Sequence, residues 1–449
     1  MKDCAILAIL TYFIIQVNRL AVVLIQEMEN KILCVAKTED STGKTEAETV
    51  KKTLDDWEIA DRIIAIGFDT TSSNTGVHRG ACTILQQLLN RQLLWLACRH
   101  HILELVVGAA FTELFGETKS PEVTLFKILK TSWDSLNLAD LVLPEIPSTY
   151  QKEKDELLNF ISSLLDSDNV KNLPRCDYKE FLELAKLILG ETVQRKKGYI
   201  YKLQRPGADH HARWMSKSIY IMKMSLLLHQ LPDLHWQTKK KVQKMTLFVV
   251  FAYLPAWFSA GSLTSAATND LKLFKRLQKF RAVHKKVSSS TSTVLNRHTW
   301  YLSEELVPLS LFDESLPLEI RTSLAKQIGE LTQGAVEICK PTLPTISQKS
   351  ELADFIGDRS TTLFDLLKIP VSFLLKTDWH LQPEYNSVKS YLKNLSPLND
   401  ACERALGLVT RLNTHITRDE ESFQELIQIV EAHQKKHSMK TKKALKTFC

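Results

Sequence analysis

The pattern of apolar and polar positions in residues 19–57 predicts a β-hairpin followed by a helix. Two β-branched runs, at 19–26 and 31–36, flank a polar turn and predict a pair of antiparallel strands. In residues 45–57 the apolar side chains recur at the three- and four-residue spacing of one helix face. The chain is therefore expected to enter its first domain through two strands and a covering helix.

The following residues alternate between strand and helix patterns. Residues 62–68 form a short, continuous apolar run, which is typical of a strand covered on both faces. A helical stripe at 80–91, a second apolar run at 93–98 and an apolar helix at 100–115 come next. The resulting order β-β-α-β-α-β-α predicts a mixed sheet with helices on its faces.

An apolar run at residues 5–17 precedes the hairpin. A secretion signal is one interpretation, with Lys2 as its basic region, but no small-x-small cleavage site follows the run. The run is also too short to span a bilayer. We therefore expect a buried strand or helix here and no membrane partner.

Length and composition predict a second, helical region. A chain of 449 residues is expected to form two or three domains. It has only 14 glycines, which favours long helices over a sandwich or barrel. From about residue 120 to residue 396 the pattern is one of helices separated by short proline-containing links. The eight cysteines show no CxxC pair, which favours reduced thiols.

The charge balance permits a nucleic-acid partner without arguing for one. The net charge of +7 arises from 58 basic and 51 acidic residues. Basic clusters include Lys239, Lys240 and Lys241, and a lysine-rich tail at 435–446. The tail is either a solvated end or a segment for nuclear import or phosphate contact. We expect a nuclear location, with a cytoplasmic one as the alternative.

Asp69 is the first candidate site residue, because it follows the apolar run at 62–68 directly. Ligands of open α/β sheets bind outside the carboxyl ends of the strands. Asp is also common where a turn begins or a helix is capped, and the local sequence by itself favours that second role.

Longer motifs resemble the catalytic domain of hAT-like transposase relatives. The resemblance is carried by residues 68–76 (FDTTSSNTG), 80–82 (GAC) and 94–105 (LWLACRHHILEL). In the family, an Asp at a strand end and a nearby Asn precede a Cys-x-x-His, and these positions correspond here to Asp69, Asn74, Cys98 and His101.

The resemblance extends through most of residues 17–433. Arg213 and Trp214 resemble the Arg-Trp that opens the family's helical insertion, and residues 298–303 fall within that insertion. Residues 399–404 (NDACER) resemble the Glu-Arg motif of the returning catalytic helix. The fold implied is α/β, with an RNase H-like mixed sheet interrupted by a large all-helical insertion domain.

The resemblance also implies a metal site. Three acids of the family hold two divalent ions, Mg²⁺ or Mn²⁺, that activate a water or a DNA 3′-hydroxyl. Asp69 would be the second acid and Glu403 the third. The first acid should lie ahead of residues 17–20 in a Trp-Asp-Gly-like context, where this sequence offers only Asp3, without Trp or Gly beside it. The strand that carries this acid is expected to be missing or replaced.

Two further motifs have competing interpretations. Cys98 and His101 have the spacing of half a zinc site, with Cys82 and His78 as the nearest additional ligands, but a buried structural pair is favoured. Trp300 is a candidate for stacking on an unpaired base, although tryptophan is more often part of a core.

The sequence thus predicts four regions: residues 1–134 as the first part of the RNase H-like domain, 135–390 as the helical insertion, 391–434 as the returning helices and 435–449 as the basic tail. The predicted function is a transposase-derived protein without catalytic activity that retains DNA or protein binding. One alternative is an active metal-dependent DNA transposase or nuclease that uses Asp69 and Glu403, with Asp3 as the missing ligand. The other is a helical interaction or dimerisation scaffold without a nucleic-acid role. A homo-oligomer remains open, and no small-molecule substrate is expected.

Overall fold

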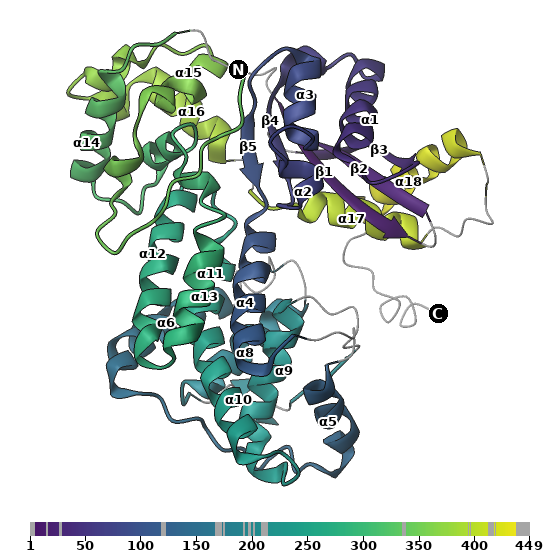
Figure 1. Cartoon of the computed structure of the whole chain (residues 1–449), viewed down its shortest axis with the longest axis vertical. Helices are drawn as coiled ribbons and strands as arrows, with labels where there is room; N and C mark the ends of the chain where they lie inside the picture. Colours follow the sequence, from purple (N-terminus) through teal and green to yellow (C-terminus); the bar gives the residue numbers. More distant parts are fainter. Residues whose placement is uncertain are drawn as a thin grey trace. The chain divides into compact units, whose positions relative to one another are not determined.

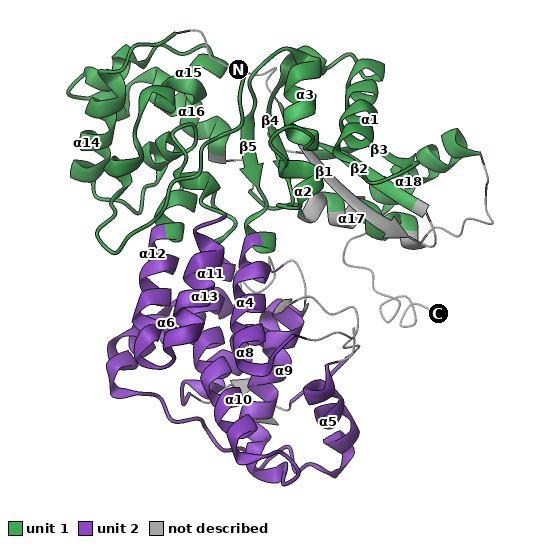
Figure 2. Cartoon of the chain, viewed as in Figure 1, with its two compact units in different colours: residues 1–101, 260–270, 298–449 green, residues 102–259, 271–297 purple. Residues whose placement is uncertain are grey.

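The structure is a computed structural model in which the chain forms two compact units. It describes residues 5–436 apart from short stretches at 15–16, 27–28, 118–122, 167–172, 174–175, 192–193, 196–198, 201–202, 208–213, 335–337, 394, 396, 412–416 and 418. Unit 1 comprises residues 1–101, 260–270 and 298–449, and unit 2 comprises residues 102–259 and 271–297 (Figure 2).

Unit 1 contains a five-stranded mixed sheet. Its strands are β1 (Ala5–Ile14), β2 (Val17–Gln26), β3 (Glu29–Thr38), β4 (Ile63–Phe68) and β5 (Leu94–Ala97), in the spatial order β3-β2-β1-β4-β5 (Figure 1). β1, β2 and β3 pair antiparallel in succession, whereas β1 pairs parallel with β4, and β4 pairs parallel with β5. The carboxyl ends of β1, β4 and β5 therefore lie at the same edge of the sheet.

The elements predicted from the pattern in residues 19–115 are confirmed. The hairpin is β2 and β3, and the helices are α1 (Gly43–Asp56), α3 (Ala81–Leu89) and α4 (Arg99–Phe115). The apolar run at 5–17 supplies β1, which lies between β2 and β4. Of the two structures expected for this run, strand and helix, the chain forms the strand, and that strand carries no acidic residue.

Helices near the chain's end return to this sheet. α17 (Asp400–Arg411) packs on β1, β2 and β3, and α18 (Glu420–Lys436) packs along β3. The side-chain amide of Gln424 bonds both the N–H and the C=O of Val35, at 2.9 Å each. Because β3 is an edge strand, this contact occupies backbone groups that would otherwise be open to pairing with another chain.

Unit 2 is mainly helical. Its helices are α4 from residue 102 onward, α5 (Thr124–Ser132), α6 (Gln151–Leu165), α8 (Cys176–Ile188), α9 (Trp214–Leu227), α10 (Trp236–Phe248), α11 (Leu254–Ser259), α12 (Ala266–Lys279) from residue 271 onward and α13 (Lys285–Leu295). A short ribbon, β6 (Gln194–Arg195) with β7 (Tyr199–Ile200), accompanies them. Among the described residues, no helix combines the length and the apolar character needed to cross a membrane.

The boundaries of the two units differ from those predicted. Residues 298–390, which include α14 (Leu318–Gly329), α15 (Thr362–Leu366) and α16 (Pro383–Lys393), belong with the sheet. Tyr301 makes one of the contacts between this segment and the sheet, because its hydroxyl donates to the Ala97 carbonyl at the end of β5, at 2.7 Å. Conversely, residues 102–134 belong to unit 2. There the aromatic rings of Phe111 in α4 and Phe126 in α5 pack with their centroids 5.8 Å apart.

Candidate functional site

Asp69 accepts three hydrogen bonds where the chain leaves β4. β4 is almost wholly buried and apolar, and Asp69 is the first polar residue after it. Its Oδ1 accepts from the Thr71 amide at 3.1 Å, the Thr71 hydroxyl at 2.6 Å and the Asn74 side-chain amide at 2.8 Å. A carboxylate that accepts from the amide two residues ahead forms an Asx-turn, and the short helix α2 (Ser72–Thr75) follows.

The loop after Asp69 is tightly packed. Asn74 is only 2% exposed, and its Nδ2 donates to Asp69 Oδ1 at 2.8 Å and to the Thr71 hydroxyl at 3.2 Å. A Cβ built on Gly80 would lie 2.5 Å from the Gly76 carbonyl oxygen, so only glycine fits at position 80. Lys340 donates from Nζ to the Thr75 carbonyl at 2.7 Å and fastens the loop from a distant part of the chain. Asp69 is therefore held in one place by its surroundings.

The start of α17 lies beside the same sheet edge. The Cys98 amide donates to the Phe68 carbonyl at 2.7 Å, and the Asn399 amide donates to Cys98 Sγ at 3.3 Å. The Arg99 amide also donates to the Pro397 carbonyl at 3.1 Å. These contacts bring the first turns of α17, which include Glu403, to the carboxyl ends of β4 and β5. The side chain of Glu403 itself lies outside the described residues.

β1 carries no acidic residue. Its parallel register with β4 pairs Ala8 with Gly67, and continuing it by two residues brings Leu10 level with Asp69. Leu10 therefore occupies the position on β1 at which this register would place the expected first acid level with Asp69. Asp3, the only acid upstream, lies outside the described residues.

The Cys-x-x-His motif serves as a junction between β5 and α4. Cys98 is 5% exposed and its sulfur faces the Asn399 amide, while His101 is half-buried. Cys82 is fully buried, and burial raises the pKa of its thiol well above the ordinary value. In the part of the chain that the structure describes, no three His, Cys, Asp or Glu side chains are grouped closely enough to hold a metal ion.

Trp300 lies in the core, which corrects its assignment to base stacking. Its side chain is only 3% exposed and stacks on Trp95 with ring centroids 5.8 Å apart. The edge of Phe68 packs against it at 5.5 Å, and the Lys340 ammonium lies 5.6 Å from its centroid. No face of the indole is left for a nucleotide base.

A buried ion pair next to this core was not predicted from the sequence. Arg99 Nη2 lies 2.8 Å from Asp270 Oδ1, and both side chains are about 5% exposed or less. Arg99 also donates to the Ala266 carbonyl at 2.8 Å, and its guanidinium lies 5.3 Å from the Tyr301 ring centroid. Burial raises the pKa of Asp270, and the Arg99 charge opposes that shift. The four residues come from three separate segments, so no local pattern reveals them.

The predicted nucleic-acid lysines lie on unit 2. Lys240 and Lys241 are exposed on α10 and Lys239 is half-buried there. Trp214 begins α9, although its side chain is not described, and Arg213 lies outside the described residues. The basic tail beyond residue 436 is also outside them.

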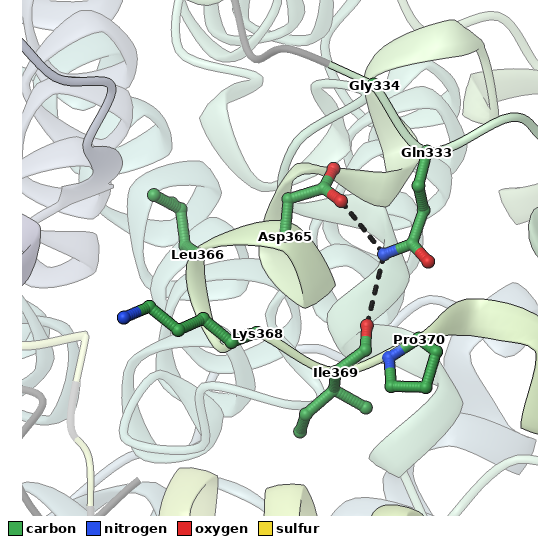
Figure 3. A pocket seen from close by; sticks show the side chains of 7 residues that line it. All are labelled: Gln333, Gly334, Asp365, Leu366, Lys368, Ile369 and Pro370. Carbon is green, nitrogen blue, oxygen red and sulfur yellow. Dashed lines mark hydrogen bonds between the residues drawn. The ribbon is translucent and has the colours of Figure 1, made fainter.

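Some of the groups that line an open surface pocket in unit 1 are joined by hydrogen bonds (Figure 3). The Gln333 amide donates to Asp365 Oδ1 at 2.8 Å and to the Ile369 carbonyl at 3.0 Å, and its oxygen accepts from the Val371 amide at 2.9 Å. The polar groups of the Gln333 side chain are therefore satisfied by their neighbours within the pocket.

Comparison with known proteins adds no family assignment. No family model matches the chain, and no curated protein matches it.

Proposed function

We propose that the chain is a transposase-derived protein with an RNase H-like sheet that has lost DNA-cutting activity and retains DNA or protein binding. The proposal rests on the resemblance of the motifs around Asp69, Cys98 and Glu403 to hAT-like transposase relatives. The strand order β3-β2-β1-β4-β5, with β1 parallel to β4, is the arrangement that this assignment requires.

The observation that carries the loss of activity is the acid-free central strand. A two-metal site needs a carboxylate that bridges both ions, and the strand beside Asp69 has Leu10 at the matching register. Asp69 Oδ1 already accepts three hydrogen bonds, which leaves Oδ2 as the oxygen for a cation. The residues present do not fit a two-metal centre. They suit at most one loosely held, hydrated ion.

Calorimetric titration of the full chain with Mn²⁺ tests this proposal. We expect weak binding that falls further in Asp69→Asn and in Glu403→Gln, with no change in Glu421→Gln, an exposed control on α18. Tight binding that neither substitution alters would show that the two acids do not form a site.

A gain-of-function variant sharpens the test. Leu10→Asp supplies a carboxylate at the register of Asp69, and Leu10→Asn supplies a similar shape without the charge. We expect Mn²⁺ affinity to rise at least about tenfold in the Asp variant alone, because one added carboxylate ligand strengthens binding of a hard cation. A folded Leu10→Asp chain with unchanged affinity would contradict the assignment of this sheet edge.

A further inference from the structure

Acidic residues are almost absent from one basic, continuous stretch of the chain, all of which the structure describes. Residues 234–303 contain twelve lysines and arginines but a single acid, Asp270, whereas the whole chain has 58 basic and 51 acidic residues. Asp270 is buried against Arg99 and cannot offset charge at the surface. The net charge of this stretch is therefore +11 (12 − 1), whereas the net charge of the whole chain is +7.

Two parts of this stretch come together in unit 2, where the ring of Phe248 in α10 packs edge to face against Phe280, shortly before α13, with ring centroids 5.3 Å apart. The charges that act on His284, at the start of α13, include Lys241 and Lys244 of α10 and Lys286 of α13. Burial lowers the pKa of His284, and Lys244 lowers it further, as expected where lysines gather around an imidazole. Glu113 of α4 is the one acid among these neighbours, so the positive sign prevails.

These lysines are available to a partner. Lys240, Lys241, Lys285 and Lys286 are exposed, and Lys239 and Lys244 are half-exposed. Within the described residues, none of the six forms an ion pair. By contrast, Lys279 of α12 is paired with Glu153. Lysines that no carboxylate neutralises retain their full attraction for an external polyanion.

An exposed aromatic ring lies at the start of α10. Trp236 is the first residue of the helix and is 58% exposed. The Lys240 ammonium lies 4.7 Å from its ring centroid. An exposed ring next to lysines is the combination with which proteins stack an unpaired base while holding the adjacent phosphates.

The helix start of α13 adds a further positive element. His284 caps it by accepting from the Val287 amide at 3.2 Å, and Lys285 and Lys286 occupy its first turn. The N-terminal end of a helix carries partial positive charge, which favours phosphate groups. A membrane surface is a poorer fit, because the apolar side of α10, with Val242, Met245 and Phe248, is buried.

We propose that the α10–α13 surface, defined by Lys239, Lys240, Lys241, Lys244, Lys285, Lys286 and Trp236, binds single-stranded nucleic acid through its phosphate backbone. The lysines contact successive phosphates and Trp236 stacks on one base. This inference rests on the DNA-binding part of the proposed function and names the surface responsible for it.

The test measures binding of a fluorescein-labelled single strand of about 30 nucleotides to the full chain by anisotropy, at about 50 to 200 mM salt. In the triple variant Lys240→Glu/Lys241→Glu/Lys244→Glu we expect at least tenfold weaker binding. The slope of log K against log salt should become shallower by about 2, because each lost phosphate contact on a single strand contributes about 0.7. Lys44→Glu/Lys52→Glu/Lys326→Glu, three exposed lysines of unit 1, changes net charge equally and should leave affinity within about twofold.

Trp236→Ala separates stacking from charge. We expect about tenfold weaker binding of the single strand and little change for the matching duplex. The triple Lys→Gln variant of the same positions, whose folding is checked by circular dichroism, should weaken binding by a smaller factor than the Glu variant. Equal affinity in the α10 and unit 1 variants would overturn the surface assignment while leaving DNA binding itself intact. Absence of binding to any nucleic acid, or preference for anionic lipid vesicles, would overturn the DNA part of the proposed function as well.

Discussion

Replacement of Asp69 distinguishes a structural carboxylate from a catalytic one. In Asp69→Ala, three donors lose their acceptor. Thr71 is exposed and its groups turn to water, but the Asn74 amide is 2% exposed, loses its charged acceptor and keeps only the longer bond to the Thr71 hydroxyl at 3.2 Å. An unsatisfied buried polar group costs about 1–3 kcal/mol, and a hydrogen bond to a charged acceptor contributes about 1.5–3 kcal/mol. Because these two contributions overlap, we expect the free energy of unfolding to fall by about 2–3 kcal/mol.

The assay is urea unfolding of the full chain, together with hydrogen exchange of the Thr71 amide. Asp69→Asn keeps an acceptor oxygen and should cost only about 1 kcal/mol. Asp61→Ala, an exposed acid just ahead of β4, serves as the control and should lie within about 0.5 kcal/mol of the native chain. Unchanged or increased stability in Asp69→Ala would refute a structural role for these hydrogen bonds. It would instead indicate that the Asp69 carboxylate is kept for catalysis at a cost in stability.

Three further predictions follow from buried groups. Trp300→Ala should lower stability by about 3–5 kcal/mol in thermal unfolding, because it empties a packed aromatic site, and a loss under 1 kcal/mol would contradict its core position. Arg99→Met should cost about 3–5 kcal/mol near neutral pH, since it leaves the Asp270 carboxylate buried and unpaired. Burial raises the folded-state pKa of Asp270, so the folded chain binds the proton more tightly than the unfolded one, and stability falls as pH rises above the unfolded value. The Arg99→Met loss should therefore shrink toward pH 4, and a pH-independent loss would speak against it. Iodoacetamide at neutral pH should modify Cys339 before Cys82, whose thiol is buried with a raised pKa; mass spectrometry of the folded chain reads the order, and equal rates would contradict it.

The sequence was most informative where one element can be recognised without its neighbours. The runs at 62–68 and 93–98 are short, continuous and bounded by polar residues, and they became β4 and β5. The run at 5–17 is also continuous but longer, so its pattern does not distinguish a buried strand from a buried helix. Its place between β2 and β4 depends on pairing with residues 63–67, which no local pattern encodes.

The candidate site was predictable only in part for the same reason. Asp69 and Asn74 are five residues apart, and their hydrogen bond follows from the turn between them. Lys340 bonds to this loop although it lies 265 residues away in the sequence. Arg99 and Asp270 are both in unit 1, but residues 102–259 of unit 2 separate them along the chain. Trp300 lies in a short turn whose apolar pattern does not reveal whether its ring is covered.

The most direct test of the proposed function is a plasmid-nicking assay. Purified full chain is incubated with supercoiled DNA and Mg²⁺ or Mn²⁺, beside Asp69→Asn and Glu403→Gln. Because the central strand carries no acid, we predict no metal-dependent nicking above the level of either variant. Nicking that requires the metal and disappears in Asp69→Asn would contradict the account and establish an active nuclease.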